Sequence, residues 1–574
     1  MRRTHTLAAG SALALTLAGL GAGGSALGAT NSPAPAAERN DPGSYVVLAR
    51  AGQDATAIAG QLAAAGATVT DINTDIGMIT LDTEASDFVA KASATSGVEG
   101  VARNRKIGQS PEVKGKPNPV EREHHGTARA GGDGARESAY RGDPLDRYLW
   151  GMDQIKAAAA HRVTLGDKRV RVGVLDTGID GTHPDLAANF DRSLSRNFTT
   201  DMPQIDGPCE YASCKDPNNV DNDGHGTHVA GTIAAAKDGF GLSGVAPKVT
   251  LVNIRGGQDS GYFFLSPVAN ALTYAGNAGL DVVNMSFYVD PWAYNCLGGA
   301  PEDSAAEARE QETIIKVMNR ALNYANDHNV TLVAAAGNGH EDLAKPRVDT
   351  SSPDFGGAPH PRTIINKRCF DLPVEGPHVL GVTSLGPSGK KSDFSNYTTA
   401  VYADEVEFAA PGGWYRDGYG TANFMTNENM ILSSAPKEVL QATGEVDGKG
   451  NVTPLGMENG VKKQCRSNAP AGADRCGYYQ WLQGTSMASP HATGVAALAV
   501  SAHGRGSADG KTMKPGSVRW LMARTATDHA CPAGGVQSYE NEGRDDSYTA
   551  ICKGTTDRNG FYGYGIVNAA GVVR

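Results

Sequence analysis

The sequence predicts an α/β protein in which a mostly parallel β-sheet is flanked by helices and preceded by a small α+β domain. Two observations predict this fold: buried apolar runs alternate with helical patterns after about residue 145, and a separate strand–helix pattern occupies 44–108. Strands that alternate with helices are typical of a parallel sheet. Strands are expected at 170–175, 249–254, 281–286 and 330–336, and helices at 265–277 and 307–327.

Residues 44–108 form the predicted small domain. SYVVLAR reads as a strand, and Asp54 can cap a helix that runs to about Ala65. TVTDIN and GMITLDT read as two strands, ASDFVAKASAT as a helix and VEGVARNRKI as a last strand. The order β-α-β-β-α-β is that of a ferredoxin-like unit. The segment contains no obvious catalytic constellation.

Residues 1–29 have the pattern of a secretory signal peptide. Arg2 and Arg3 precede the short apolar stretch 12–20, and small residues follow it. A transmembrane anchor is the alternative, but the stretch is shorter than the roughly 20 residues that span a bilayer, and glycine dilutes it. No later segment approaches that length, so we expect a secreted, extracellular protein without a stable membrane anchor.

The stretch 109–144 is polar and rich in glycine, proline and charge, which predicts an exposed linker. His124 and His125 lie in it and are expected to be solvated rather than bound to a metal. In an exported protein, a small domain followed by such a linker suggests a propeptide, with the processing site in the linker. The region 145–574 is then the main domain.

The composition excludes several classes of protein. Lys and Arg number 52 and Asp and Glu 62 among 574 residues, which gives a net charge of −10. No basic block is present, so nucleic acid is not expected as a partner. Hydrophobic residues make up 40% and charged residues 20%, which argues against wholesale disorder. Glycine contributes 72 residues without a Gly-X-Y period, which excludes collagen and fits a loop-rich globular enzyme.

Eight cysteines in an exported chain indicate disulfides. The sequence alone does not select among the 105 possible pairings. A zinc site is the alternative, but no C-x-x-C spacing supports it. Near neighbours suggest Cys209–Cys214, Cys465–Cys476 and Cys531–Cys552, which leaves Cys296–Cys369.

The first of three glycine-framed motifs is VRVGVLDTGIDGTHPDL. Asp176 follows the predicted strand 170–175 at its carboxyl end, where open α/β sheets place their active sites. A cap of a turn or helix is the alternative interpretation of this aspartate.

The second motif is DNDGHGTHVAGTIAA, which contains His225 and His228. Histidine is the side chain best suited to accept a proton near neutral pH. The H-x-x-H spacing could also hold a metal, but no glutamate of the H-E-x-x-H type accompanies it.

The third motif, GTSMASPHATGVAALAV, places Ser486 near the start of an apolar helix. The unpaired N–H groups and the macrodipole at a helix N-terminus favour an oxyanion that develops at a carbonyl under attack. For an isolated G-T-S, a helix cap would be the common interpretation.

Asp, His and Ser in this chain order are found in subtilisin. The motifs DTGID, HGTHVAGT and GTSMASPH resemble the three signatures of subtilisin-like serine proteases nearly letter for letter, and further segments resemble the family in the expected order through about 145–574. The chain is therefore identified as a member of the subtilase family, of the secreted bacterial type. The segment 44–108 resembles the family's inhibitory propeptide by pattern.

The resemblance implies a role for each catalytic residue. Asp176 should orient and stabilise the imidazole of His225, the general base, and Ser486 should be the nucleophile of an acyl transfer. Asn338 follows the predicted strand 330–336 and should form the oxyanion hole with the Ser486 N–H. His228 matches a position that packs in the family.

Two extended segments should flank the substrate as added strands, which are Ser260-Gly261-Tyr262 and Ser286-Phe287-Tyr288. Many subtilases read S-L-G at the second segment. Phe287 and Tyr288 depart from that pattern, which predicts a reshaped specificity pocket. Alternatively, Phe287 packs into the neighbouring core.

The main domain is longer than the compact form of the family. The surplus lies in loops at about 288–312, 340–378 and 413–480, several of which carry cysteines. Such loops around a cleft would stabilise the protein or restrict access to it. A restricted cleft would suit a dipeptidyl- or tripeptidyl-releasing aminopeptidase, which is the alternative to a secreted serine endopeptidase.

Two further classes of protein are alternatives to a peptidase. A non-catalytic, protein-binding subtilase homologue is the alternative of another class, and the intact Asp176, His225, Ser486 and Asn338 argue against it. An esterase of the α/β-hydrolase type would need the order Ser…Asp…His with G-x-S-x-G, which this chain does not follow.

No cofactor is expected for catalysis. The resemblance implies a structural calcium, with Asp185, Asp238 and Gln154 as ligands, although Lys237 intrudes in that loop. The expected partners are polypeptide substrates and the chain's own propeptide as an intramolecular inhibitor, and the protein is expected to be a monomer.

Overall fold

The computed structural model describes residues 43–105, 120–123, 138–354, 359–402, 405–469, 472–507 and 510–574. All of them belong to one compact unit, 40–574. The expected signal peptide at 1–29 lies outside the described residues, as does most of the expected linker. Among the described residues, the longest apolar helices fall short of what is needed to cross a membrane.

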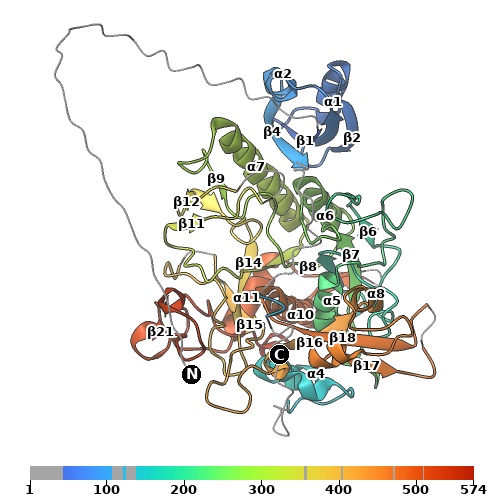
Figure 1. The fold of residues 1–574 in the computed structure, drawn as a ribbon, viewed down its shortest axis with the longest axis vertical. Coiled ribbons are helices and arrows are strands. Elements are labelled where there is room, and N and C mark those ends of the chain that lie inside the picture. Colours follow the sequence, from blue (N-terminus) through green and yellow to red (C-terminus); the bar gives the residue numbers. More distant parts are fainter. Residues whose placement is uncertain are drawn as a thin grey trace, which may run out of the picture. The chain divides into compact units, whose positions relative to one another are not determined.

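A seven-stranded sheet forms the centre of the main domain (Figure 1). All its pairings are parallel, which confirms the predicted α/β class. Four strands fall where the sequence predicts them, and three further strands were not predicted. In spatial order the strands are β15 (Phe408–Pro411), β14 (Val379–Leu385), β10 (Thr331–Ala335), β8 (Val282–Met285), β5 (Arg171–Leu175), β7 (Thr250–Arg255) and β6 (Arg196–Asn197).

The sheet is buried on both faces, which explains why its strands are continuously apolar. In β5, Val172 and Val174 join the core beneath helices α5 (His225–Ala234) and α10 (Thr485–His503). Leu175 joins a second core beneath α6 (Leu265–Asn277) and α7 (Ala305–Asp327). Alternate side chains of one strand therefore support opposite layers of helices.

Helix α7 begins earlier than the sequence predicts. The Ser304 side chain accepts a hydrogen bond from the Glu307 N–H, and the Glu307 side chain accepts one from the Ser304 N–H. This capping box satisfies N–H groups that the first turn leaves without helical partners, so the helix starts at Ala305.

The small domain has the predicted β-α-β-β-α-β order. Its antiparallel sheet has the spatial order β2-β3-β1-β4. The elements are β1 (Gly43–Ala49), α1 (Ala55–Ala64), β2 (Thr68–Asn73), β3 (Met78–Thr83), α2 (Phe88–Ala94) and β4 (Val98–Arg105). Asp54 caps α1 as expected, since its side chain accepts from the N–H groups of Thr56 and Ala57.

The two faces of this small sheet have different partners. Tyr45 and Val47 of β1 pack under the domain's own helices, whereas Val46 and Leu48 join the core around α6 and α7 of the main domain. Arg320 of α7 donates to the Ala49 carbonyl at 2.8 Å and to the Ile76 carbonyl at 2.9 Å. The small domain is thus docked on the helices that cover one face of the parallel sheet.

The main domain contains further ordered elements, inside and outside the surplus loops, that the sequence analysis did not predict. The additional helices are α3 (Trp150–Gln154), α4 (Ala157–His161), α8 (Lys437–Ala442), α9 (Pro454–Glu458), α11 (Pro515–Thr525) and α12 (Ala569–Val572). Short 3₁₀ turns occur at Asp146–Tyr148, Asn427–Asn429, Ala533–Gly535 and Asp546–Tyr548. The additional strands are β9 (Asn295–Cys296), β11 (Arg347–Asp349), β12 (Arg362–Ile364), β13 (Cys369–Phe370), β16 (Ile431–Ala435), β17 (Lys462–Cys465), β18 (Cys476–Leu482), β19 (Arg505–Ser507), β20 (Gly510–Thr512), β21 (Val536–Gln537) and β22 (Ala550–Ile551).

Disulfides hold several of these loops, and the four suggested pairs are confirmed. They are Cys209–Cys214, Cys296–Cys369, Cys465–Cys476 and Cys531–Cys552. Two of them, Cys296–Cys369 and Cys465–Cys476, join paired strands.

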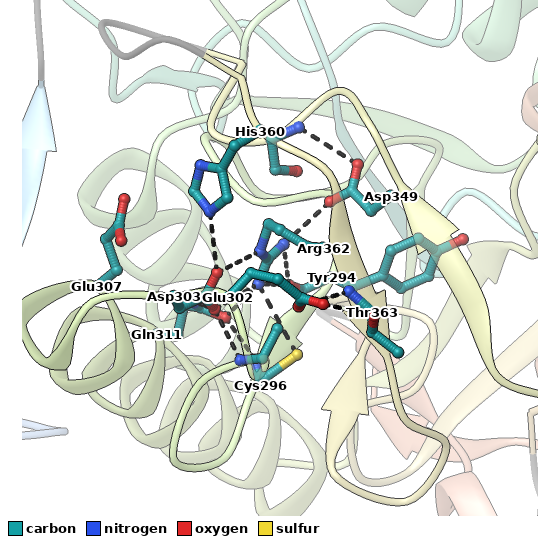
Figure 2. A network of polar contacts seen from close by, with 12 residues as sticks. Tyr294, Cys296, Glu302, Asp303, Glu307, Gln311, Asp349, His360, Arg362 and Thr363 are labelled. Carbon is teal, nitrogen blue, oxygen red and sulfur yellow. Dashed lines mark hydrogen bonds and ion pairs between the residues drawn. The ribbon is translucent and has the colours of Figure 1, made fainter. Parts of the chain in front are cut away.

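A buried arginine organises the loop around Cys296–Cys369 (Figure 2). Arg362 donates from Nε to Asp303 Oδ1 at 2.8 Å and from Nη1 to Asp349 Oδ2 at 2.9 Å. It also donates to the Gln311 side chain at 2.7 Å and to the Tyr294 carbonyl at 3.2 Å. One guanidinium thus links segments from four parts of the chain.

Arg362→Met is expected to lower the free energy of unfolding by about 3–5 kcal/mol, because it leaves the buried carboxylates of Asp303 and Asp349 without their cation. Chemical denaturation in a Ser486→Ala background, which avoids self-digestion, measures this. Arg162→Met, at an exposed position, is the control. Equal stability of the two variants would contradict the role of Arg362 as the cation that neutralises Asp303 and Asp349.

Candidate active site

Asp176 and His225 form a buried pair at the carboxyl end of the parallel sheet. Asp176 directly follows β5 and is 0% exposed. The distance between Asp176 Oδ1 and His225 Nδ1 is 2.7 Å, and the same oxygen accepts from the Thr177 N–H at 2.8 Å. The carboxylate therefore orients the imidazole, so that Nε2 is the nitrogen left for other partners.

Close packing of α5 brings His225 to this position. A Cβ on Gly226 would lie 2.2 Å from the Gly178 carbonyl oxygen, so only glycine permits this approach. His228 lies one turn later and points elsewhere, since its Nε2 is 3.1 Å from the Ile431 carbonyl oxygen. Burial lowers the pKa of His228 to about 3, which keeps its ring neutral.

Ser486 lies in the first turn of α10, directly beside the end of β8. Its Oγ donates to the Ser286 carbonyl at 3.4 Å, and the Ser286 Oγ donates back to the Ser486 carbonyl at 3.1 Å. Ser286 thereby fixes the predicted nucleophile against the sheet.

Asn338 follows β10, and Thr485 fixes the orientation of its amide. Asn338 Oδ1 accepts from the Thr485 N–H at 2.9 Å and from the Thr485 hydroxyl at 2.8 Å. With the oxygen engaged in this way, Nδ2 is the group available as a donor. A Cβ on Gly484 would lie 3.4 Å from this Nδ2 and 3.2 Å from Glu121 Oε1, so both atoms are close to Gly484.

The carboxyl group of Glu121 occupies the space between the predicted base and nucleophile. Glu121 Oε1 is 3.6 Å from His225 Nε2, and the carboxyl also accepts a hydrogen bond from Ser486. Burial alone would raise the pKa of Glu121, but the charge of His225 and the hydrogen bonds from His225 and Ser486 outweigh it and lower the pKa. Glu121 is therefore an anion at neutral pH, beside the triad residues.

Glu121 raises the pKa of His225 in turn. Burial would lower the pKa of this imidazole, but the carboxylates of Asp176 and Glu121 raise it well above its ordinary value. With Glu121 in place, the two carboxyl groups favour the protonated form of His225, which does not accept a proton.

Further contacts anchor the segment Val120–Glu123. The Gln483 N–H donates to the Glu121 carbonyl at 3.3 Å, and Gln483 Nε2 donates to the Val120 carbonyl at 2.9 Å. The carboxylate of Glu123 binds Arg416 and Arg544, with Arg416 Nε 2.6 Å from Oε1 and Arg544 Nη2 3.1 Å from the same oxygen. The segment is thus built into the main domain.

The prediction of an exposed linker over 109–144 is wrong for several of its described residues, while Ala139, Arg141, Gly142 and Pro144 are exposed as predicted. Glu121 is 6% exposed, and Tyr140 belongs to the main core. The sequence analysis missed Glu121 and Glu123 because polar composition indicates exposure and gives no sign of a specific polar partner. The sequence feature at this place is the run VERE at 120–123, which has no distinctive pattern.

The two predicted substrate segments lie close to the site, but several of their side chains point into the protein. Ser260 Oγ donates to Asp206 Oδ1 at 2.6 Å, and Gly261 takes a positive φ of 81°. Tyr262 is buried in a small cluster with Met202 and Phe264. Their backbone rather than their side chains is left to contact a peptide.

In the second segment, Phe287 and Tyr288 are both engaged by neighbouring side chains. Phe287 stacks on Phe263 with ring centroids 4.0 Å apart, which supports the alternative that it packs into the neighbouring core. Tyr288 donates from its hydroxyl to Asp354 Oδ2 at 2.7 Å. Phe263 directly follows the first segment, so the stacked pair joins the second segment to the chain next to the first.

Each of the three residues expected to bind calcium has other polar partners in this structure. Asp238 Oδ2 is 2.8 Å from Arg466 Nη1, so a guanidinium already neutralises it. Asp185 Oδ2 accepts from the Leu242 N–H at 3.0 Å and the Tyr479 hydroxyl at 2.9 Å. Gln154 donates instead to the carbonyls of Gly386 and Pro387. We derive no role for calcium from this set.

Two other clusters bring ligand-type atoms within 4.8 Å of one another: Asp303 with Glu307 and His360, and Asp201 with Glu210 and Asp259. In each cluster, one carboxylate forms an ion pair with the guanidinium of a neighbouring arginine. Arg362 binds Asp303 (Figure 2), and Arg255 Nη2 is 2.5 Å from Asp259 Oδ1. We interpret both clusters as ion-pair networks.

Comparison with known proteins agrees with this geometry. Residues 167–565 match the model of the subtilase family. Fervidolysin from Fervidobacterium pennivorans is 27% identical over 393 residues, which are 67% of this chain and 41% of fervidolysin. Subtilisin Savinase from Lederbergia lenta is 35% identical over 189 residues, 33% of this chain and 55% of that protein. The chain thus matches about half the length of these relatives. Thermitase from Thermoactinomyces vulgaris is 24% identical over 413 residues, 71% of this chain and 99% of thermitase.

Solved structures share the fold. The epidermin leader peptide processing serine protease from Staphylococcus aureus superposes with a TM-score of 0.58 at 19% identity, over 93% of this chain and 98% of that one. Fervidolysin superposes with a TM-score of 0.50 at 22% identity, over 93% of this chain and 61% of that one. Since the model of the subtilase family matches residues 167–565, which are most of the chain, the chain belongs to the subtilase family.

Proposed function

We propose that this chain is a secreted serine endopeptidase that uses an Asp176–His225–Ser486 triad and is matured by removal of its propeptide. The observation that supports it most is the Glu121 carboxyl, which contacts His225 Nε2 and Ser486 together while His225 Nδ1 binds Asp176 at 2.7 Å. One small group can therefore touch base and nucleophile at once, as the reacting peptide group must.

In the proposed mechanism, Ser486 Oγ attacks a peptide carbonyl while His225 Nε2 takes its proton. Asp176 holds the imidazole through Nδ1 and stabilises the imidazolium. The oxyanion accepts hydrogen bonds from the Ser486 N–H and Asn338 Nδ2. His225 then protonates the leaving amine, and water, activated by the same imidazole, releases the acyl group and restores Ser486.

In the proposed precursor, two parts of the chain inhibit the enzyme. The small domain docks on α6 and α7, and Val120–Glu123 fills the space over the triad. Removal of both would open the site and return His225 to its neutral form at physiological pH.

Intact mass of the secreted protein and sequencing of fragments from an unstructured protein substrate test the proposal. A product that lacks the small domain and Val120–Glu123, together with internal cuts in the substrate, is the expected result. Release of only dipeptides or tripeptides from substrate N-termini would instead establish the aminopeptidase. A mature protein that cuts nothing would support the non-catalytic homologue.

The pH profile should depend on Glu121. The general base must be neutral, so activity of the mature enzyme is expected to rise through roughly pH 6–7. In the precursor the carboxylates of Asp176 and Glu121 raise the pKa of His225. The rate at which an organophosphofluoridate modifies Ser486 should therefore increase at a higher pH in the precursor than in the mature form. Glu121→Gln in the precursor should shift this rise back to lower pH.

Glu84→Gln, at an exposed position in the small domain, is the matched control. It should leave the midpoint of the pH profile of Ser486 modification unchanged. The same midpoint in the precursor with and without the Glu121 carboxylate would contradict this electrostatic coupling.

A further inference from the structure

We propose that Arg416, Arg544 and Gln483 form a binding site for a carboxylate side chain of the polypeptide substrate, on the leaving-group side of the scissile bond. The inference rests on the proposed peptidase function and adds a substrate preference to it: an acidic residue, Glu or Asp, shortly after the cut.

The site already holds a carboxylate, that of Glu123. Arg416 Nε is 2.6 Å from Oε1, and Arg544 Nη2 is 3.1 Å from Oε1 and 3.2 Å from Oε2. Gln483 Nε2 donates to Oε2 at 3.0 Å. The Glu123 side chain is only 16% exposed. Two guanidinium groups and an amide that converge on both oxygens are the donor set that recognises a carboxylate in preference to a neutral amide.

The donors are positioned by the main domain and not by the occupant. Arg416 Nη1 donates to the Glu542 carbonyl at 2.9 Å, and Arg544 Nε donates to Asp393 Oδ2 at 2.5 Å. Gln483 Oε1 accepts from the Tyr415 N–H at 2.6 Å. Asp393 offsets one of the two guanidinium charges, and Glu123 offsets the other. If the linker leaves on maturation, this preorganised site therefore attracts another anion.

The position of the site relative to the triad assigns it to the leaving-group side. Gln483 lies just before Ser486 in the chain, and it holds the Val120 carbonyl while the Glu121 carboxyl contacts Ser486. Ser286, which belongs to the segment where the reshaped specificity pocket is expected, contacts Ser486 from the end of β8. Val120–Glu123 forms a turn, closed by the Glu123 N–H and the Val120 carbonyl at 3.4 Å. An extended peptide gains about 3.3–3.6 Å per residue, so it would reach the pocket within the first three residues after the cut.

Internally quenched peptides that differ only in Glu or Gln, placed in turn at each of three positions before and three after the cut, test this on the mature enzyme. A charge-assisted pair of this kind should make kcat/KM about 10-fold higher for Glu than for Gln at one position after the cut. In Arg416→Gln and Arg544→Gln the ratio of kcat/KM for Glu to that for Gln should fall below about 2-fold. Arg162→Gln, at an exposed position, should keep the wild-type ratio.

Arg544 also pairs with the buried Asp393, so its variant could fail to be secreted, and Arg416→Gln then decides. Cleavage of all peptides without Glu/Gln discrimination after the cut, or discrimination that survives in Arg416→Gln, would overturn the carboxylate site and leave the peptidase proposal intact. Failure to cleave any peptide would overturn both.

Discussion

Replacement of Ser486 by alanine is expected to lower kcat by about a million-fold, because the loss of the nucleophile removes the whole acyl-enzyme route and makes the His225 base useless. Its Oγ lies between the Ser286 carbonyl and the Glu121 carboxyl, and a methyl group fits there without new contacts. Initial rates on a quenched peptide, at enzyme concentrations high enough to detect background cleavage, measure the loss.

Ser517→Ala is the matched control, since Ser517 is exposed on α11. The Ser486→Ala precursor should also retain its N-terminal region, because self-processing needs the same nucleophile. A Ser486→Ala protein that keeps more than about one thousandth of the wild-type rate after purification from other proteases would mean that Ser486 is not the nucleophile.

Asn338→Ala is expected to lower kcat by about 10²–10³-fold with little change in KM, because the lost amide donor acts on charge that develops only in the transition state. Thr485 fixes this amide by two bonds to its Oδ1, so Nδ2 is held without reorganisation. Steady-state kinetics that resolve kcat from KM are the measurement.

Thr485→Val provides a graded comparison. It removes the hydroxyl bond at 2.8 Å and keeps the backbone N–H bond to the same oxygen, so its loss should be smaller than that of Asn338→Ala. If Asn338→Ala raised KM and left kcat unchanged, Asn338 would bind the ground state and not the oxyanion.

The buried carboxyl of Glu121 gives the proposed zymogen two levels of control. It blocks the space that a substrate carbonyl would enter, and it holds the general base in its protonated form. Docking of the small domain on α6 and α7 would keep this segment at high local concentration. Loss of Val120–Glu123 would therefore change both the access of substrate to the site and the protonation of His225.

Much of the fold follows from local sequence patterns. Apolar runs predicted β5, β7, β8 and β10 because strands buried on both faces must be continuously apolar. The continuous apolar run in SYVVLAR likewise reflects a small sheet that packs on helices on both of its sides. Glycine-framed motifs directed attention to Asp176, His225, Ser486 and Asn338 because close backbone approaches, such as that of Gly226 to Gly178, leave a mark in the sequence.

By itself, the sequence determined the fold class and the candidate catalytic residues, and it suggested the short-range disulfides, because all of these depend on neighbours in the chain or on short motifs. Only the tertiary structure decided that Glu121 and Glu123 are buried, that Phe287 packs on Phe263, and that Arg362 and Arg255 neutralise acidic clusters. Glu123 meets Arg416 and Arg544 across 293 and 421 residues of chain. The physical reason is that a polar side chain carries no local sign of its partner, because ion pairs and hydrogen bonds form between groups that only the folded chain brings together.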